Sequence, residues 1–281
     1  MVQYAHDAQQ ALDWKESILE YASVNKNRVR GCILFKISLI NISNYILTGF
    51  PEDNIQVYEI YNSKVQTEAR THPAITETQK FLLSQLWHTS NPESQISLST
   101  PISYFDRLRI RQPGDAKFAL GPHIDGGSVE RWEDEGFRSV FSNIFKGGSG
   151  WALHDPYDAS PRLNAKQDMY HSPNACSIFR PWQGWTSLSF TGPDQGTLRV
   201  LPMLKLATAY IMLRPFFRIN PRDMDDWNLD VDSPAFPGSS IGKTQELNAK
   251  THPHLQLDRS MVSIPRVAPG DQVYCEPYSY C

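Results

Sequence analysis

The spacing of apolar side chains separates an N-terminal part with helical periodicity from a longer part with the character of β-structure. Over residues 8 to 25, apolar positions such as Trp14 recur at steps of three and four, which predicts an amphipathic helix. The same spacing returns from residue 62 to residue 88, where Pro73 interrupts it. We therefore expect a helical N-terminal region over residues 1–100.

The pattern changes after residue 100 to short apolar runs separated by Gly, Pro, Asn and Asp, which is typical of a β-sandwich or barrel. Residues 220 to 250 are predicted to form a long polar loop. Strands are expected around Leu108 and Ile110 and at residues 139–145, 176–180, 185–190, 197–201, 206–213, 260–264 and 272–274. Helices followed by many strands indicate an α+β, mainly β protein, with a helical layer packed on a double-sheet jelly roll over residues 101–281. We expect the two parts to form one structural domain.

The segment from Cys32 to Thr48 differs from its surroundings, because it is dense in Ile and Leu and nearly free of charge. A membrane span needs about 20 mostly apolar residues, and this run is shorter and contains Lys36 and Asn41. A buried pair of strands is a second interpretation. A translated intron is a third, since Gly31 would join naturally to Phe50. All three interpretations stay open at this point.

Composition narrows the function without assigning it. The chain of 281 residues has a net charge of -3, which gives no electrostatic reason to expect nucleic acid or an anionic membrane as a partner. Its four cysteines show no CxxC spacing, so we expect reduced thiols in a cytoplasmic protein. The first residues lack the basic and apolar regions of a signal peptide.

The candidate chemistry lies in the segment from Gly121 to Gly127, which reads Gly-Pro-His-Ile-Asp-Gly-Gly. If this segment is extended, alternation along the strand places His123 and Asp125 on the same face. An imidazole and a carboxylate at that spacing supply two corners of the facial triad that holds non-haem Fe(II). The alternative is a histidine that forms a hydrogen bond with a neighbouring aspartate at the end of a strand.

Three segments resemble a family of fungal and bacterial proteins of unassigned function, which is similar to the Fe(II)/2-oxoglutarate oxygenases and near the phytanoyl-CoA dioxygenases. They are residues 121–132, the stretch from Trp151 to Ala159, and residues 196–202. The resemblance runs from about Ala11 to Asp271, apart from residues 32–48.

This resemblance implies a double-stranded β-helix, the cupin-like jelly roll. It also implies that His123 and Asp125 are the first two iron ligands, with Fe(II) and 2-oxoglutarate as cofactor and cosubstrate. The expected reaction is a hydroxylation-type oxidation of a small-molecule substrate.

The C-terminal end departs from the family's pattern. Residues 269–274 resemble the turn and strand that lead to a distal histidine, yet neither a histidine nor a basic residue follows Asp271. We therefore expect a core that is incomplete at its C-terminal end and lacks the clamp for 2-oxoglutarate. His252 and His254 are the nearest substitutes, with His254 as the candidate third ligand. The alternative function is that of a catalytically inactive relative or truncated gene product, at most a binding module.

Overall fold

A computed structural model describes residues 7–25, 56–58, 60–103, 105–111, 114, 120–172, 178–220 and 222–275. The three interpretations of Cys32 to Thr48 concern residues outside these ranges. Within them, helices alternate with short antiparallel strands, and these strands form no closed barrel. The double-stranded β-helix therefore stays a prediction.

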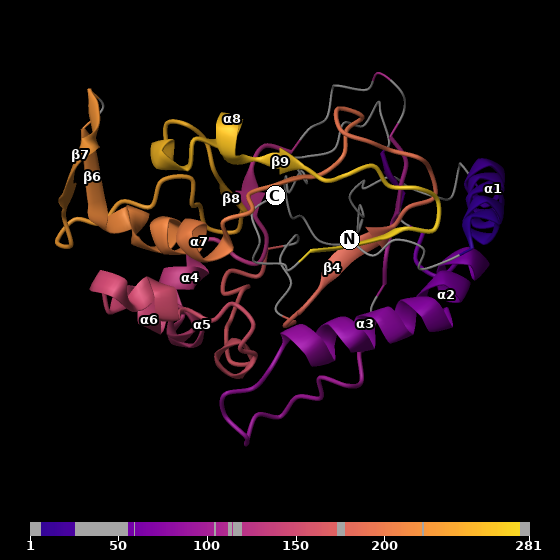
Figure 1. The fold of residues 1–281 in the computed structure, drawn as a ribbon, viewed down its shortest axis with the longest axis horizontal. Coiled ribbons are helices and arrows are strands. Elements are labelled where there is room, and N and C mark those ends of the chain that lie inside the picture. Colours follow the sequence, from indigo (N-terminus) through magenta and orange to yellow (C-terminus); the bar gives the residue numbers. More distant parts are fainter. Residues whose placement is uncertain are drawn as a thin grey trace, which may run out of the picture.

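The predicted N-terminal helices are confirmed. They are α1 (Ala8–Val24), α2 (Lys64–Thr71) and α3 (Pro73–Leu86). Trp14 lies on the buried face of α1, and the Asp7 side chain accepts a hydrogen bond from the backbone N–H of Gln9 at the start of that helix. Pro73 ends one helix and begins the next, since proline fits the first turn, where its missing N–H has no intrahelical role. Figure 1 shows α2 and α3 following one another along one side of the molecule.

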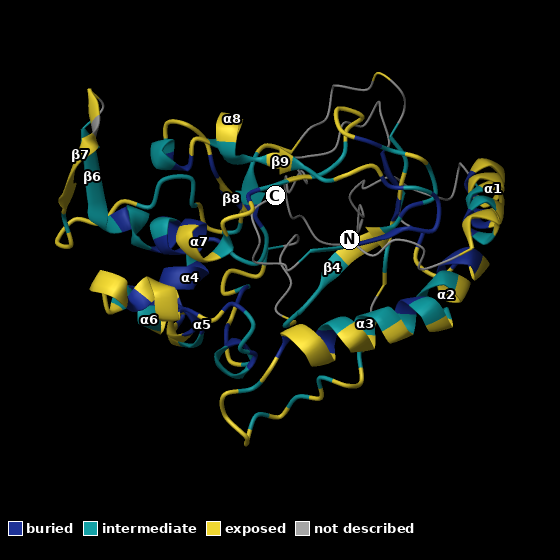
Figure 2. Cartoon of the chain, in the orientation of Figure 1, coloured by how far each residue is buried: buried dark blue, intermediate teal, exposed yellow. Residues whose placement is uncertain are grey.

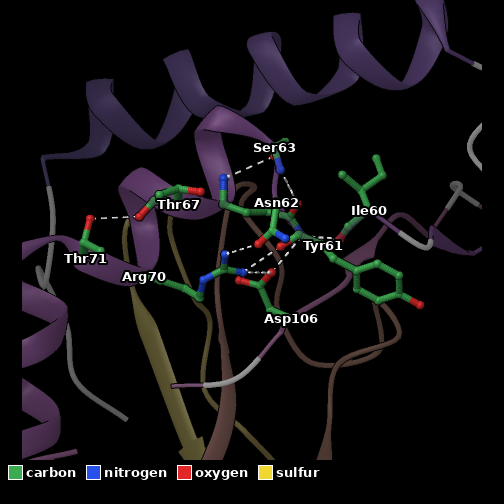
Figure 3. A network of polar contacts seen from close by, with 9 residues as sticks. Ile60, Tyr61, Asn62, Ser63, Thr67, Arg70, Thr71 and Asp106 are labelled. Atoms are coloured by element: carbon green, nitrogen blue, oxygen red, sulfur yellow. Dashed lines mark hydrogen bonds and ion pairs between the residues drawn. The ribbon is translucent and has the colours of Figure 1, made fainter. Parts of the chain in front are cut away.

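A polar network fixes α2 to the segment that precedes the strand β2 (Leu108–Arg109) (Figure 3). The Arg70 guanidinium lies 2.9 Å from an Asp106 carboxylate oxygen and also donates to the Tyr61 carbonyl and the Asn62 side chain. The Gln66 side chain donates to the same Asp106 oxygen at 2.7 Å. The Asp106 carboxylate thus connects α2 to a segment that lies 36 positions beyond Arg70 in the sequence.

The strands of the described residues form five two-stranded antiparallel sheets, four of which join segments far apart in sequence. The pairs are β1 (Val57–Tyr58) with β2, β3 (His123–Ile124) with β8 (Gln245–Glu246), β4 (Gln183–Thr186) with β10 (Gln272–Cys275), β5 (Arg199–Val200) with β9 (Val262–Ser263), and β6 (Phe217–Asn220) with β7 (Asp223–Leu229). In Figure 1 the β6–β7 hairpin projects from the body of the molecule.

A second group of helices follows the candidate segment, and several of them build a buried apolar cluster. The α-helices are α4 (Glu130–Glu133), α5 (Glu135–Val140), α6 (Ser142–Phe145), α7 (Leu204–Leu213) and α8 (Leu257–Ser260), and the 3-10 helices are η1 (Gly148–Leu153), η2 (Ser160–Arg162), η3 (Arg214–Phe216) and η4 (Pro253–Leu255). Phe137 is completely buried and packs in a cluster with Trp132 and Met212. Figure 2 shows that the buried residues of this group lie where α4, α5 and α7 meet.

Two strand predictions are wrong, because residues 139–145 and 206–213 are helical. Helix α7 is buried on two sides: Ile211 packs in the cluster around Ile124, and Met212 packs in the cluster around Phe137. A helix that is apolar on most of its surface lacks the three- and four-residue spacing of polar and apolar positions that would distinguish it from a buried strand.

The long polar loop predicted over residues 220 to 250 is also wrong in part, because β7 and β8 lie within it. The described side chains of β7 are exposed, and its three aspartates and one asparagine give the segment the composition of a polar loop although Trp227 and Leu229 alternate near its end. Residues 178–180 of the strand predicted at 176–180 have no strand conformation, whereas β4, β5, β9 and β10 each overlap a predicted strand.

None of the helices in the described ranges combines the length and the apolar composition needed to cross a bilayer. The cytoplasmic location expected from the cysteines stays a prediction.

Candidate metal centre

The candidate segment forms a short strand followed by a glycine turn. His123 lies in β3 opposite Glu246 of β8, and the intervening Ile124 is buried in an apolar cluster. Gly126 and Gly127 both have positive φ angles, of 78° and 84°, which residues with a Cβ atom rarely adopt. Because Ile124 occupies the core side of the strand, its two neighbours project from the other side.

The structure brings His123 and Asp125 together. The His123 Nε2 atom lies 3.5 Å from Asp125 Oδ1, and the side chains are 16% and 32% exposed. On its other side, His123 Nδ1 lies 2.8 Å from the Gly121 carbonyl oxygen. A carbonyl only accepts, so Nδ1 carries the hydrogen and Nε2 of the neutral ring presents its lone pair to Asp125.

Two acceptor atoms that face one another need a positive charge between them, which either a shared proton or a metal ion supplies. Metal–nitrogen and metal–oxygen bonds of about 2.1 Å, with the two atoms 3.5 Å apart, give an angle of roughly 110° at the ion. The separation of the two atoms is therefore one that two ligands of a single metal ion can span. The donor set of one imidazole and one carboxylate also suits Fe(II).

The second oxygen of Asp125 is held from a distant strand. The Gln183 side chain on β4 donates a hydrogen bond to Asp125 Oδ2. Burial acts to raise the pKa of Asp125, but its interaction with His123, the hydrogen bond from Gln183 and the positive charge of Arg180 outweigh it and place the pKa below its ordinary value. The carboxylate is therefore ionised at neutral pH, which is the form that binds a metal.

Arg131 of α4 supports the backbone around the turn. This side chain is 2% exposed, and one of its terminal nitrogens donates to the carbonyls of both Asp125 and Gly126 at 3.0 Å. The other donates to the Gln245 side chain on β8. Neither Arg131 nor Gln183 is among the sequence-predicted site residues, although Arg131 lies within residues 121–132, one of the segments that carry the family resemblance.

The contacts described for His252 and His254 are with residues other than His123 and Asp125. His252 is 1% exposed, and burial, with the charge of Arg214, lowers its pKa to about 4. His254 Nδ1 lies 3.2 Å from the Tyr210 hydroxyl, and its ring packs on Trp227 with centroids 4.9 Å apart. Across the part of the chain that the structure describes, no three His, Cys, Asp or Glu side chains gather in a way that could hold a metal. The structure thus does not group His254 with His123 and Asp125, and a third ligand stays a prediction.

A second histidine, His154, lies near the other side of β3. It lines a cavity of about 10 Å³, enough for one water molecule, together with Ile124 and Arg131. Burial, with the charge of Arg162, lowers the pKa of His154 to about 4, so the ring is neutral at pH 7. Its sequence neighbour Asp155 contacts His88 instead, at 2.9 Å.

Together, these features define a mixed helical and β-stranded protein that carries a His-x-Asp pair at the end of a short strand. The chain belongs to the Gig2-like family, whose model matches residues 1–277. It is 32% identical over 267 residues to the "Uncharacterized protein YbiU" of Escherichia coli K12, a match that covers 95% of this chain and 58% of YbiU.

Several solved structures are similar to this chain. The Candida albicans protein GIG2, the product of GlcNAc Inducible Gene 2, is 34% identical with a TM-score of 0.80, and the match covers 98% of this chain and 55% of GIG2. A "Putative Oxidoreductase" from Salmonella typhimurium LT2 is 29% identical with a TM-score of 0.76, over 99% of this chain and 61% of that protein. The chain spans little more than half the length of these relatives.

The family match corrects one expectation from the sequence. We expected a family near the phytanoyl-CoA dioxygenases, and this placement is wrong, because the model that matches nearly the whole chain is that of the distinct Gig2-like family. The segments that carried the resemblance, residues 121–132, 151–159 and 196–202, lie within the matched range.

Proposed function

We propose that this chain carries the metal-binding part of an Fe(II)- and 2-oxoglutarate-dependent oxygenase, which performs a hydroxylation-type oxidation of a small molecule. His123 and Asp125 bind the iron, and a double-stranded β-helix is the fold that we propose around them. The observation that carries the proposal is the pair of facing acceptor atoms, His123 Nε2 and Asp125 Oδ1, 3.5 Å apart. The Salmonella typhimurium neighbour, by its printed name, supports the broader class of oxidoreductase.

The residues of this chain prepare the metal ligands in three ways. The Gly121 carbonyl fixes the tautomer of His123, which leaves Nε2 as the ligand atom. Gln183 holds Oδ2 of Asp125, so that Oδ1 turns toward the histidine. The lowered pKa of Asp125 keeps the carboxylate ionised. When bound, iron supplies the coordination positions at which 2-oxoglutarate and O₂ react.

A second candidate function is a binding module without catalysis. It is favoured by the observation that, within the described ranges, no third His, Cys, Asp or Glu side chain joins His123 and Asp125. Two protein ligands bind a metal more weakly than three, and a protein of this kind would bind a small molecule without activating O₂.

An anaerobic titration tests the proposal. Fe(II) is added to the full chain with 2-oxoglutarate, and we expect a weak visible charge-transfer band that His123→Ala and Asp125→Ala each abolish. The matched control is His88→Ala, which removes a different His–Asp pair, between His88 and Asp155, and leaves the band unchanged. A featureless spectrum of the unmodified chain at high ligand concentration contradicts the proposal. A band without succinate formation after O₂ is admitted favours the binding module.

A further inference from the structure

The turn after Asp125 has little of its own to hold its shape. Gly126 and Gly127 have positive φ angles and carry no side chains that could pack against the protein. A Cβ atom on Gly127 would lie 3.2 Å from the Phe137 ring, so the backbone approaches this side chain closely. The shape of the turn therefore depends in large part on what binds its carbonyl groups.

The Arg131 guanidinium binds those carbonyl groups. One of its terminal nitrogens donates to the Asp125 and Gly126 carbonyls, each at 3.0 Å, and the other donates to the Ser128 carbonyl at 3.3 Å. A planar guanidinium offers donors in a fixed fork, whereas a lysine ammonium offers all its donors from one nitrogen. Only the arginine can hold these carbonyls from two nitrogens at once.

The same guanidinium also fixes the turn relative to the strand that carries His123. It donates to the Gln245 side chain at 3.0 Å, and Gln245 pairs with Ile124 across β3 and β8. Both Arg131 and Gln245 are buried, at 2% and 1% exposure, so water does not compete freely for these hydrogen bonds. The side chain thus connects the backbone of one proposed ligand to the strand pair of the other.

We infer that Arg131 is a positioning residue, which sets the separation of His123 Nε2 and Asp125 Oδ1 by holding the Asp125–Gly126 carbonyls against β8. This inference rests on the proposed function insofar as the two side chains bind a metal. Arg131 itself contacts neither ligand atom in the hydrogen bonds described, and it acts through the backbone. Replacements of residues that orient metal ligands typically lower metal affinity about 10- to 100-fold.

The test compares Arg131→Lys with Arg138→Lys in the full chain. Arg138 is the matched control, because its guanidinium also donates to a backbone carbonyl, that of Trp132 at 2.7 Å. Trp132 lies in α4, which follows the glycine turn, so this hydrogen bond does not hold the turn itself. Co(II) binding is measured anaerobically by absorption, well below the unfolding temperature of each variant. We expect Arg131→Lys to weaken Co(II) binding at least 10-fold and Arg138→Lys to change it less than twofold.

A measurement without metal separates the positioning role of Arg131 from the proposed metal-binding function. In hydrogen–deuterium exchange of the metal-free chain, we expect faster exchange in the peptide that contains Ser128 for Arg131→Lys and not for Arg138→Lys. If the unmodified chain binds neither Co(II) nor Fe(II), the proposed function fails, and faster exchange at the turn still supports the positioning role. Equal Co(II) affinity or unchanged exchange at the turn in folded Arg131→Lys overturns the inference. If Arg131→Lys does not fold, Gln245→Leu, which removes the acceptor on β8, takes its place with the same expected results.

Discussion

Gly184 gives a sharp test of how β4 supports the candidate metal centre. This glycine pairs with Tyr274 across β4 and β10, and it directly follows Gln183, whose side chain holds Asp125. A Cβ atom placed on Gly184 would lie 1.8 Å from the Val273 carbonyl oxygen. That atom belongs to the backbone of the paired strand, so it cannot rotate away as a flexible side chain would.

The replacement Gly184→Ala therefore has to separate the two strands or bend one of them. Inserting a methyl group where the paired backbone leaves no space costs about 1–3 kcal/mol, and for chains of this size each kcal/mol lowers Tm by roughly 2–4 °C. We expect a loss of stability in this range, together with a weaker Asp125–Gln183 contact and weaker metal binding. Guanidinium unfolding followed by tryptophan fluorescence measures the first effect, and the anaerobic Fe(II) titration measures the second.

The control is Gly192→Ala, because a Cβ atom there would meet its nearest neighbours at 3.6–3.9 Å, which is ordinary contact. We expect its stability to stay within about 0.5 kcal/mol of that of the unmodified chain. If Gly184→Ala unfolds at the same denaturant concentration as both the unmodified chain and Gly192→Ala, the close approach of β4 and β10 is refuted.

Three further predictions follow from buried groups. Phe137→Ala, which removes a completely buried ring, lowers the free energy of unfolding by about 3–5 kcal/mol in urea denaturation. The control Phe81→Ala, on the exposed face of α3, changes it by less than about 0.5 kcal/mol. Equal effects of the two replacements contradict the assigned burial. Asp134→Ala removes the carboxylate that accepts from the Phe137 and Lys166 N–H groups and costs at least about 1 kcal/mol in the same assay, while Asp134→Asn costs less. The free energy of unfolding decreases as pH falls from about 6.5 to 4. In this range His154 and His252 stay neutral in the folded chain, because their pKa values are about 4, while the same histidines take up protons in the unfolded chain. Stability that does not change with pH in this range contradicts the burial of both rings.

The elements that the sequence predicts well are those whose signals are local. The apolar positions of α1 recur at steps of three and four residues, about one helical turn. Pro73 marks the boundary between α2 and α3 independently of the tertiary structure. Helix α7 has no such signal, because two different clusters cover it. Its apolar residues report burial on both sides, and only the tertiary structure shows that the buried element is a helix.

The same distinction applies to the candidate metal centre. The proximity of His123 and Asp125 follows from alternation over two residues, which the sequence contains. The contact between Gln183 and Asp125 spans 58 positions, and that between Arg131 and Gln245 spans 114. No periodicity reports such contacts, since they depend on which short strands pair after the chain has closed long loops.

The short strands also explain why the apolar core controls the geometry of the centre. Strands β3 and β8 contribute only two residues each, and an isolated two-stranded pair is marginally stable in water. Ile124 packs with Leu247 and Ile211 in one buried cluster, which holds β3 against β8 and against α7. Because successive side chains of a strand point to opposite sides, burial of Ile124 fixes the direction of His123 and of the chain that enters Asp125. The core-facing residue between the two proposed ligands thus orients both of them, and the hydrogen bonds of Gln183 and Arg131 then set their final separation.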